Sequence, residues 1–326
     1  MKRLIFVTIL LMLVLAGCGS APSAGEITPP TIDTGVDANA WVQVPAGAYP
    51  SGLHDHITDV NYDYEIMVTD VTVEQYTKFL NDALAANAIT MGAIDVDAGF
   101  NVDDDELVAP RTVEGVGGDY PGDPYDGHKH EMQILPGKKL YMPLNTDGIH
   151  INFDGSQFTF APEYGNHPVT MVSWFGANAY CQFYDWHLPL DVEWEKAARG
   201  TEIDAEGHGR PFPWGDDIRP NNANYYSSFD LFEKIFGKLG NTTPVGFYNG
   251  KTYEGYETLD SASPYGLYDM AGNVWQWMGD DYPDMHYRYL RGGSYYSYEV
   301  DLRVWKINST GPETYAPDIG FRCARN

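Results

Sequence analysis

Three short motifs near the end of the chain constrain its fold more than any other feature. In order they read Gly266-Leu-Tyr-Asp-Met-Ala-Gly-Asn-Val-Trp-Gln-Trp277, Arg291-Gly-Gly-Ser294 and Gly320-Phe-Arg-Cys-Ala324. Taken together they are rich in glycine and aromatic residues, and the whole chain has the same character, with 34 Gly, 24 Tyr, 14 Phe and 8 Trp. Long helical runs are few. This composition favours a loop-rich α+β domain that is held together by aromatic packing.

The three motifs resemble the C-terminal half of formylglycine-generating enzymes, also called sulfatase-modifying factors. Leu188-Pro-Leu-Asp-Val-Glu-Trp-Glu-Lys-Ala-Ala-Arg-Gly200 is similar to a helix of the same family. The resemblance covers residues 41–82 and 166–326. It implies one domain over 41–326 with a C-type-lectin-related architecture, interrupted by an insertion over about 85–165.

In this family a copper-binding, oxidising cysteine pair follows the Arg-Gly-Gly-Ser motif. The matching positions here hold Ser297 and Leu302, which we call the degenerate positions. Neither side chain offers the soft thiolate that Cu(I) prefers. The resemblance therefore implies the scaffold without its oxidase chemistry. We expect no copper and no catalytic residues at this place.

The start of the chain has the pattern of a processing signal. Lys2 and Arg3 precede an apolar run over 4–15, and Leu15-Ala-Gly-Cys18 has the form of a lipobox. We expect residues 1–17 to be removed, Cys18 to be lipidated, and 18–40 to form a flexible tether. The domain would then be anchored by lipid to a membrane of the cell envelope, on the extracytoplasmic side. An ordinary cleaved secretory signal is the alternative.

The charge balance narrows the range of partners. With 20 Lys+Arg against 46 Asp+Glu, the formal net charge is −26. Such a chain repels phosphates, which argues against nucleic acid and anionic lipid as partners. It is compatible with calcium, with cationic partners, or simply with solubility.

Two cysteines remain once Cys18 is assigned to lipid. They are Cys181 and Cys323, and an even number in an oxidising compartment is compatible with a disulfide or with two small buried residues. The family has a structural disulfide between the matching places. The resemblance therefore implies a Cys181–Cys323 bond.

Several elements can be read directly from local patterns. Strands are expected over 41–48 and 64–71. A capping box of Thr72 and Gln75 predicts a helix behind it, and Ser173 is the expected N-cap of another. A third helix follows Leu190 and ends at Gly200. Within the insertion, alternating residues on both sides of Asp154-Gly155 predict a hairpin.

The resemblance also implies a calcium site, built from carboxylate or amide side chains and backbone carbonyls. Its expected ligands are Asp269, Gly272, Val274 and Gln276. The last is usually glutamate in the family, so affinity should be reduced. Alternatively, Asp269 and its neighbours satisfy backbone amides in a tight turn. The family has a second calcium site, whose first matching residue here is Asn224. The aspartate of that site is missing, since the matching place falls near Gly237.

The remaining candidates concern ligand binding. We expect a protein, peptide or glycan ligand on the C-terminal face, where rigid aromatic side chains suit recognition. The candidate ligand-binding residues are Trp275, Arg291, Ser294, Tyr295, Tyr296, Ser297, Tyr298, Trp305 and Asp318. An asparagine precedes Gly-Phe-Arg in the family, so Asp318 also alters the expected recognition of sulfatase peptides.

Two rival functions stay open. The first is an enzyme with a different reaction in a biosynthetic pathway, for which Glu299, Asp301 and Arg303 are acid–base candidates. The second is true sulfatase maturation, which the missing cysteines disfavour. The histidine pairs His54/His56 and His128/His130 are expected to be solvated loop residues.

Overall fold

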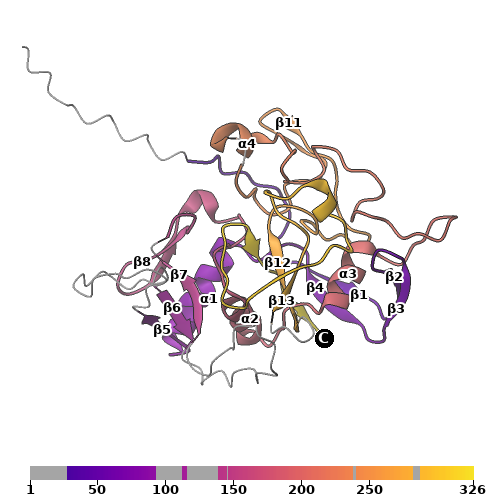
Figure 1. Ribbon diagram of the computed structural model, residues 1–326. Helices are drawn as coiled ribbons and strands as arrows, with labels where there is room; N and C mark the ends of the chain where they lie inside the picture. The colour runs from indigo at the N-terminus through magenta and orange to yellow at the C-terminus, as the bar shows by residue number, and fades with distance from the viewer. Residues whose placement is uncertain (1–27, 93–111, 116–138, 145, 238–239, 282–286) are drawn as a thin grey trace, which may run out of the picture.

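A computed structural model describes residues 28–92, 112–115, 139–144, 146–237, 240–281 and 287–326. The expected signal segment and Cys18 lie outside these ranges, as do His128 and His130. In the described ranges, no helix has the length and apolarity needed to cross a membrane. The described chain forms a mixed α/β, loop-rich fold with short helices and several small sheets (Figure 1).

Two sheets organise the part of the molecule that carries the three C-terminal motifs. One has the order β1-β4-β16, and all its pairings are antiparallel. The other has the order β14-β13-β12-β15, with β12 and β15 parallel. Their bounds are β1 Trp41–Val44, β4 Tyr64–Met67, β16 Ala324–Arg325, β14 Asn308–Thr310, β13 Arg288–Arg291, β12 Trp275–Asp281 and β15 Ile319–Gly320. Each motif thus lies on or beside a strand of this second sheet or on β16.

The expected helices are present and begin at the expected caps. In α1 (Val73–Ala85), Thr72 and Gln75 form the predicted capping box. In α2 (Trp174–Phe183), the Ser173 side chain accepts from the Gly176 amide. The helix α3 (Asp191–Arg199) ends at Gly200, whose φ of 76° lies in the region that favours glycine. A short helix that the sequence did not predict, α4 (Leu231–Phe236), is capped by Asp230.

The insertion contains the predicted hairpin. Strands β8 (Ile151–Phe153) and β9 (Phe158–Phe160) pair antiparallel, and the Asp154 carboxylate accepts from the Ser156 and Gln157 amides in the turn. The remaining short elements are β2 Gly47–Ser51, β3 His56–Val60, β5 Ile89–Gly92, β6 Thr112–Gly115, β7 Leu140–Pro143, β10 Thr252–Tyr253, β11 Tyr256–Glu257 and the 3-10 turns Pro162–Tyr164 and Glu299–Asp301. Pairing of β5, β6 and β7 makes a small sheet of the insertion's own.

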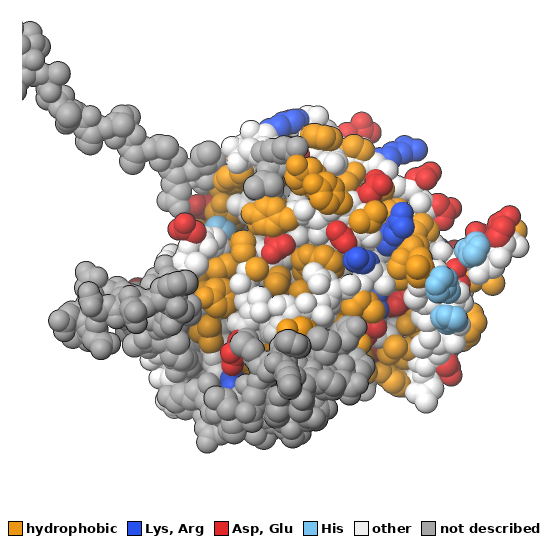
Figure 2. All heavy atoms as spheres, in the orientation of Figure 1, with side chains coloured by type: hydrophobic (Ala, Val, Ile, Leu, Met, Phe, Trp, Pro, Cys, Tyr) orange, Lys and Arg blue, Asp and Glu red, His pale blue; other side chains and the backbone are white. Residues whose placement is uncertain are grey.

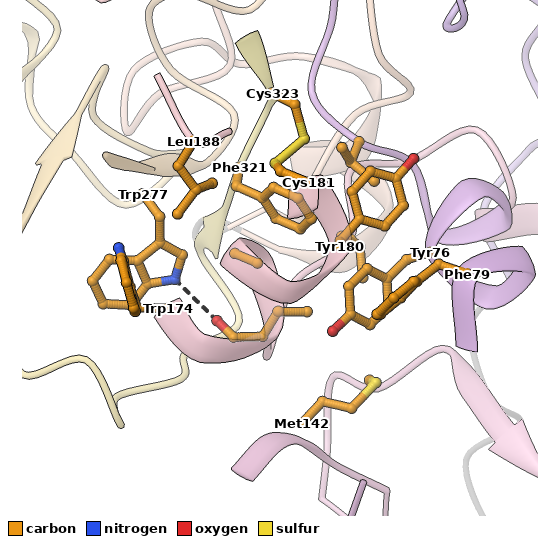
Figure 3. Packing of buried hydrophobic residues seen from close by; sticks show 14 of the residues in the cluster. Tyr76, Phe79, Met142, Trp174, Tyr180, Cys181, Leu188, Trp277, Phe321 and Cys323 are labelled. Carbon is orange, nitrogen blue, oxygen red and sulfur yellow. Dashed lines mark hydrogen bonds between the residues drawn. A yellow bond between two sulfur atoms is a disulfide. The ribbon is translucent and has the colours of Figure 1, made fainter. Parts of the chain in front are cut away.

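The largest core cluster packs around a disulfide. Cys181 in α2 and Cys323 next to β16 are bonded, with their Cα atoms 5.8 Å apart. Figure 3 shows Tyr180 and Phe321 beside the two sulfur atoms, and their rings meet edge to face. The bond joins the middle of the chain to its end, as the resemblance implied.

The domain begins earlier than the sequence predicted. Residues 28–40 were expected to belong to a flexible tether, but Ile32 and Thr34 are buried. The Thr34 hydroxyl donates to the Val245 carbonyl over 2.9 Å, and its own carbonyl accepts from Lys251 and Asn249. Hydrogen bonds between side chains and backbone carbonyls, together with the buried Ile32, hold a segment whose composition is typical of a linker.

Candidate ligand-binding site

The two degenerate positions lie in different environments. Ser297 is buried, and its Oγ accepts from the Ser294 amide over 3.0 Å. Leu302 is completely buried in an apolar cluster with Phe212, Tyr225 and Ala271. One position therefore carries a hydroxyl held in a turn, and the other carries a hydrocarbon that fills the core.

A short polar chain runs from Ser297 to Asp318. The Oγ atoms of Ser297 and Ser294 are 3.4 Å apart, and Ser294 Oγ donates to Asp318 Oδ2 over 2.7 Å. Burial raises the pKa of the Asp318 carboxyl, and the hydrogen bond from Ser294 acts in the opposite direction. Trp275 is tied to the same residue, because its amide donates to the Asp318 carbonyl over 2.8 Å. The structure thus brings together four of the residues expected at the site.

The candidate tyrosines divide into core and surface residues. Tyr295 is buried, and its hydroxyl donates to the Pro317 carbonyl. Tyr296 and Tyr298 are 40% and 58% exposed. The ring of Tyr298 also packs on that of Tyr226, with centroids 4.7 Å apart. Two aromatic side chains beside the polar chain are therefore accessible to a ligand.

Arg291 is part of the framework and does not reach solvent. Its guanidinium is buried and donates to both carboxylate oxygens of Asp191 over 2.6 and 2.7 Å, with Glu195 at 3.1 Å. It also donates to the Val304 carbonyl. Its expected role as a ligand contact is wrong, since its donors are used within the protein. Asp191 and Glu195 stand at i and i+4 on α3, where two carboxylates repel each other unless a cation lies between them, and this spacing is the sequence signal for a buried arginine.

Trp305, expected to contact a ligand, instead contacts two arginines of the protein. It is half-buried, and the guanidinium groups of Arg199 and Arg303 lie 5.2 and 5.8 Å from its ring centroid. Asp301 pairs with Lys306 over 3.4 Å, while Glu299 is exposed. Of the three proposed acid–base residues, Glu299 is therefore exposed, while Asp301 and Arg303 are half-buried and contact Lys306 and Trp305.

The expected calcium ligands do not offer a matching set of free oxygens. Gln276 Oε1 accepts from Trp194 Nε1 over 2.7 Å and from Arg322 Nε over 2.8 Å, which uses both of its lone pairs. Its amide nitrogen donates to the Asp269 carbonyl. The Asp269 carboxylate accepts from the Gly246 amide over 2.6 Å, and burial raises its pKa to about 6. The Arg322 guanidinium thus occupies the Gln276 oxygen that calcium would need. The Asp269 carboxylate satisfies a backbone amide, as the alternative held, but that amide belongs to Gly246, 23 residues earlier, and not to a tight turn.

Histidines do not converge on a metal in the described ranges. His54 and His56 are exposed on and beside the β2–β3 hairpin, as predicted, and Figure 2 shows histidines gathered at this edge of the molecule. The hydrogen bond of His208 to Asp55 raises the pKa of its imidazole. Among the residues with assigned structure, no group of three or more His, Cys, Asp or Glu side chains is arranged to hold a metal ion.

Comparison with known sequences identifies the family of this chain. Residues 29–326 match the family described as "Sulfatase-modifying factor enzyme 1-like domain". The chain is 35% identical over 164 residues to the "Inactive C-alpha-formylglycine-generating enzyme 2" of Bos taurus, a match that covers 48% of this chain and 50% of that protein. It is 33% identical over 183 residues to the "Serine/threonine-protein kinase Pkn1" of Chlamydia trachomatis, covering 51% of this chain. The matched segment spans 25% of that kinase.

Structure comparison gives the same fold. The crystal structure of CarF superposes with a TM-score of 0.50 at 20% identity, covering 88% of this chain and 97% of CarF. At this identity the likeness concerns the fold alone. The family match extends over nearly all of the chain that the structure describes, including all three C-terminal motifs. The chain therefore belongs to the family of sulfatase-modifying factor enzyme 1-like domains.

Proposed function

We propose that this chain is a non-oxidising member of the family that binds a peptide or protein ligand on its C-terminal face. One observation supports the proposal: Leu302, which the resemblance matches to one of the family's two cysteines, is completely buried, and Ser297, matched to the other, is buried as well. A thiolate pair that holds Cu(I) has no substitute in a hydroxyl and a hydrocarbon. The name of the bovine relative, which contains the word "Inactive", supports a family branch without the oxidase reaction.

The binding role rests on the surface next to these positions. Tyr296 and Tyr298 present exposed rings, and the half-buried carboxylate of Asp318, held by the Ser294 hydroxyl, belongs to the adjoining polar chain. Aromatic rings supply large contact areas at a small loss of conformational entropy, and a few polar groups then fix the orientation of a ligand. Calcium has no part in this proposal, because Arg322 and Trp194 already engage Gln276.

A random-peptide phage library tests the binding role. The full chain is used for selection, and enriched peptides are then measured against Tyr296→Ala/Tyr298→Ala and against Ile57→Ala, an exposed residue on β3. We expect the double variant to lose affinity by about tenfold or more, as for aromatic anchors in other interfaces. The Ile57→Ala protein should bind as the wild type does. Peptides that bind all three proteins equally would place the binding surface elsewhere.

We also propose that Cys18 carries a lipid that anchors the domain outside the cytoplasm. The Leu15-Ala-Gly-Cys18 pattern supports the anchor, and the Cys181–Cys323 disulfide supports an oxidising compartment. A Cys18→Ser chain should accumulate as precursor or appear in the soluble fraction. Normal maturation and retention in the membrane fraction would contradict the anchor.

A further inference from the structure

A pocket lies away from the degenerate positions. It has a volume of about 270 Å³ and is bordered by the starts of β1 and α1, the end of α2 and the turn that follows it. Its lining residues are Asn39, Trp41, Met67, Gln75, Lys78, Tyr180, Tyr184 and Trp186. We call it the aromatic pocket. None of the ligand candidates from the sequence lines it.

The aromatic walls of this pocket are held in fixed positions. The rings of Trp41 and Trp186 meet edge to face with centroids 4.8 Å apart, and Tyr184 lies 4.9 Å from Trp186. The Arg325 guanidinium lies 4.3 Å from the Trp41 ring centroid, and Glu65 holds that guanidinium over 2.8 Å. All three rings are only partly buried. They therefore form a rigid surface that solvent and a ligand can reach.

The Cys181–Cys323 disulfide stabilises the chain segments that form the aromatic pocket. The Trp186 amide donates to the Cys181 carbonyl over 2.8 Å, and Arg325 lies two residues after Cys323. Tyr180, which lines the pocket, packs beside the same disulfide (Figure 3). The covalent bond thus fixes the two chain segments that present Trp186 and Arg325. The ligand would meet a pre-formed surface, and little ordering would be needed on binding.

The polar groups at the rim select the class of ligand. Lys78 pairs with Asp82, so the rim ammonium is neutralised, and the Tyr184 hydroxyl lies 3.5 Å from the same carboxylate. The guanidinium of Arg325 is paired with Glu65 in the same way, so neither of these two cations offers a charged ligand a free partner. A neutral ligand with hydroxyl groups and a flat apolar face fits these constraints.

We infer that the aromatic pocket binds a neutral sugar ring of a glycan. The C–H bonds on one face of a pyranose carry weak positive charge and pack well against the negative face of an aromatic ring. Ring hydroxyls then reach the exposed side chains of Asn39 and Lys78 at the rim. This inference concerns a different surface from the peptide-binding face, so the two stand or fall separately.

A microarray of neutral oligosaccharides, probed with the full chain, tests the inference. We expect binding to at least one family of neutral glycans, and calorimetry with the strongest of them then compares variants. Trp186→Ala and Trp41→Ala should each weaken binding by about tenfold or more, since each removes an aromatic wall. Trp214→Ala is the matched control, because Trp214 is half-buried but does not line this pocket.

Thermal unfolding of each variant separates lost binding from lost structure. Should Trp186→Ala not fold, Trp186→Phe and Lys78→Ala carry the test, since the first keeps a ring and the Lys78 side chain is 68% exposed. Weaker binding in both, with unchanged thermal stability, supports the pocket. The inference is overturned if no neutral glycan binds the wild type, or if the bound glycan has the same affinity for the pocket variants.

Discussion

Two neighbouring regions of this molecule differ in how their side chains are used. The first, which we call the buried frame, consists of Gln276, Arg291, Arg322 and the Cys181–Cys323 disulfide. Each polar member of the frame has several hydrogen bonds within the protein. The second is the segment 295–302, which follows the Arg-Gly-Gly-Ser motif. It exposes Tyr296 and Tyr298, and its two degenerate positions carry no thiol.

The difference separates what maintains the fold from what performs the family's chemistry. A buried guanidinium is destabilising unless it is paired, so one change in the frame leaves several groups without partners. A thiol in the segment leaves no buried charge unpaired when it is lost, so a hydroxyl or a hydrocarbon can take its place with local adjustment. A chain can therefore keep the scaffold and its recognisable motifs while the reaction is lost.

The largest effect is expected from the disulfide of the frame. Replacing Cys181 and Cys323 together by alanine should lower the free energy of unfolding by about 5 kcal/mol, because the bond closes a long loop, with a separation of 142 residues. Urea unfolding measures this loss. Peptide mapping of the denatured, non-reduced wild type should recover the two cysteines linked. Recovery of both cysteines as free thiols would show that the Cys181–Cys323 bond is absent and would contradict this prediction.

Arg322 gives the next effect. Its guanidinium donates to the carbonyls of Met67 and Tyr268 and pairs with the buried carboxyl of Asp70 over 3.2 Å. Arg322→Met should lower the free energy of unfolding by about 3–5 kcal/mol, since these groups remain buried without a partner. Arg210→Met is the control, because Arg210 pairs with the largely exposed Glu202 and should contribute about 0–1 kcal/mol.

The Arg322 effect should also depend on pH. Burial raises the pKa of Asp70 from 3.8 to about 8, with Arg322 opposing the shift. A carboxyl with a raised pKa in the folded state stabilises it most below the ordinary pKa, and this contribution is lost as pH rises through about 8. Without Arg322 the charged form is less favourable still. The variant's deficit should be larger near about pH 8 than near about pH 5, and a deficit independent of pH would contradict this role of Asp70.

The segment offers a sharper contrast within itself. Leu302→Ala should lower the free energy of unfolding by about 2–5 kcal/mol, because it opens a cavity in the apolar cluster. Ser297→Ala removes the acceptor of the buried Ser294 amide and should lower the free energy of unfolding by about 1–2 kcal/mol. Tyr298→Ala, at an exposed residue, should change it by less than about 0.5 kcal/mol. Chemical denaturation measures the free energy of unfolding of the three variants. Equal losses in all three would contradict this ranking and would mean that the segment is packed as one unit.

Much of this contrast could be predicted from the sequence. The caps at Thr72 and Ser173 and the hairpin at Asp154-Gly155 depend on local hydrogen bonds, so local patterns were sufficient for them. The resemblance supplied the family and the disulfide pairing, which parity alone left open. The resemblance also indicated the degenerate positions, since the family's cysteines stand at fixed distances from the residue that matches Ser294.

Long-range contacts were less accessible. Arg291 looked like a ligand contact because nothing in its own neighbourhood of the sequence indicates that Asp191, about a hundred residues earlier, accepts from it. Residues 28–40 looked like a tether because their anchors, Val245 and Lys251, lie 211 and 217 residues after Thr34. The aromatic pocket combines Trp41 with Trp186, and only the fold brings them together.

The central claim is that the fold persists here without the family's oxidation of cysteine. The direct measurement incubates the purified full chain with a sulfatase-type peptide, with and without copper, and follows the mass of the substrate cysteine. We expect no conversion to formylglycine above a control containing metal alone, because positions 297 and 302 offer a hydroxyl and a buried hydrocarbon. Turnover above that control would contradict the account and require a cysteine-independent route on this fold.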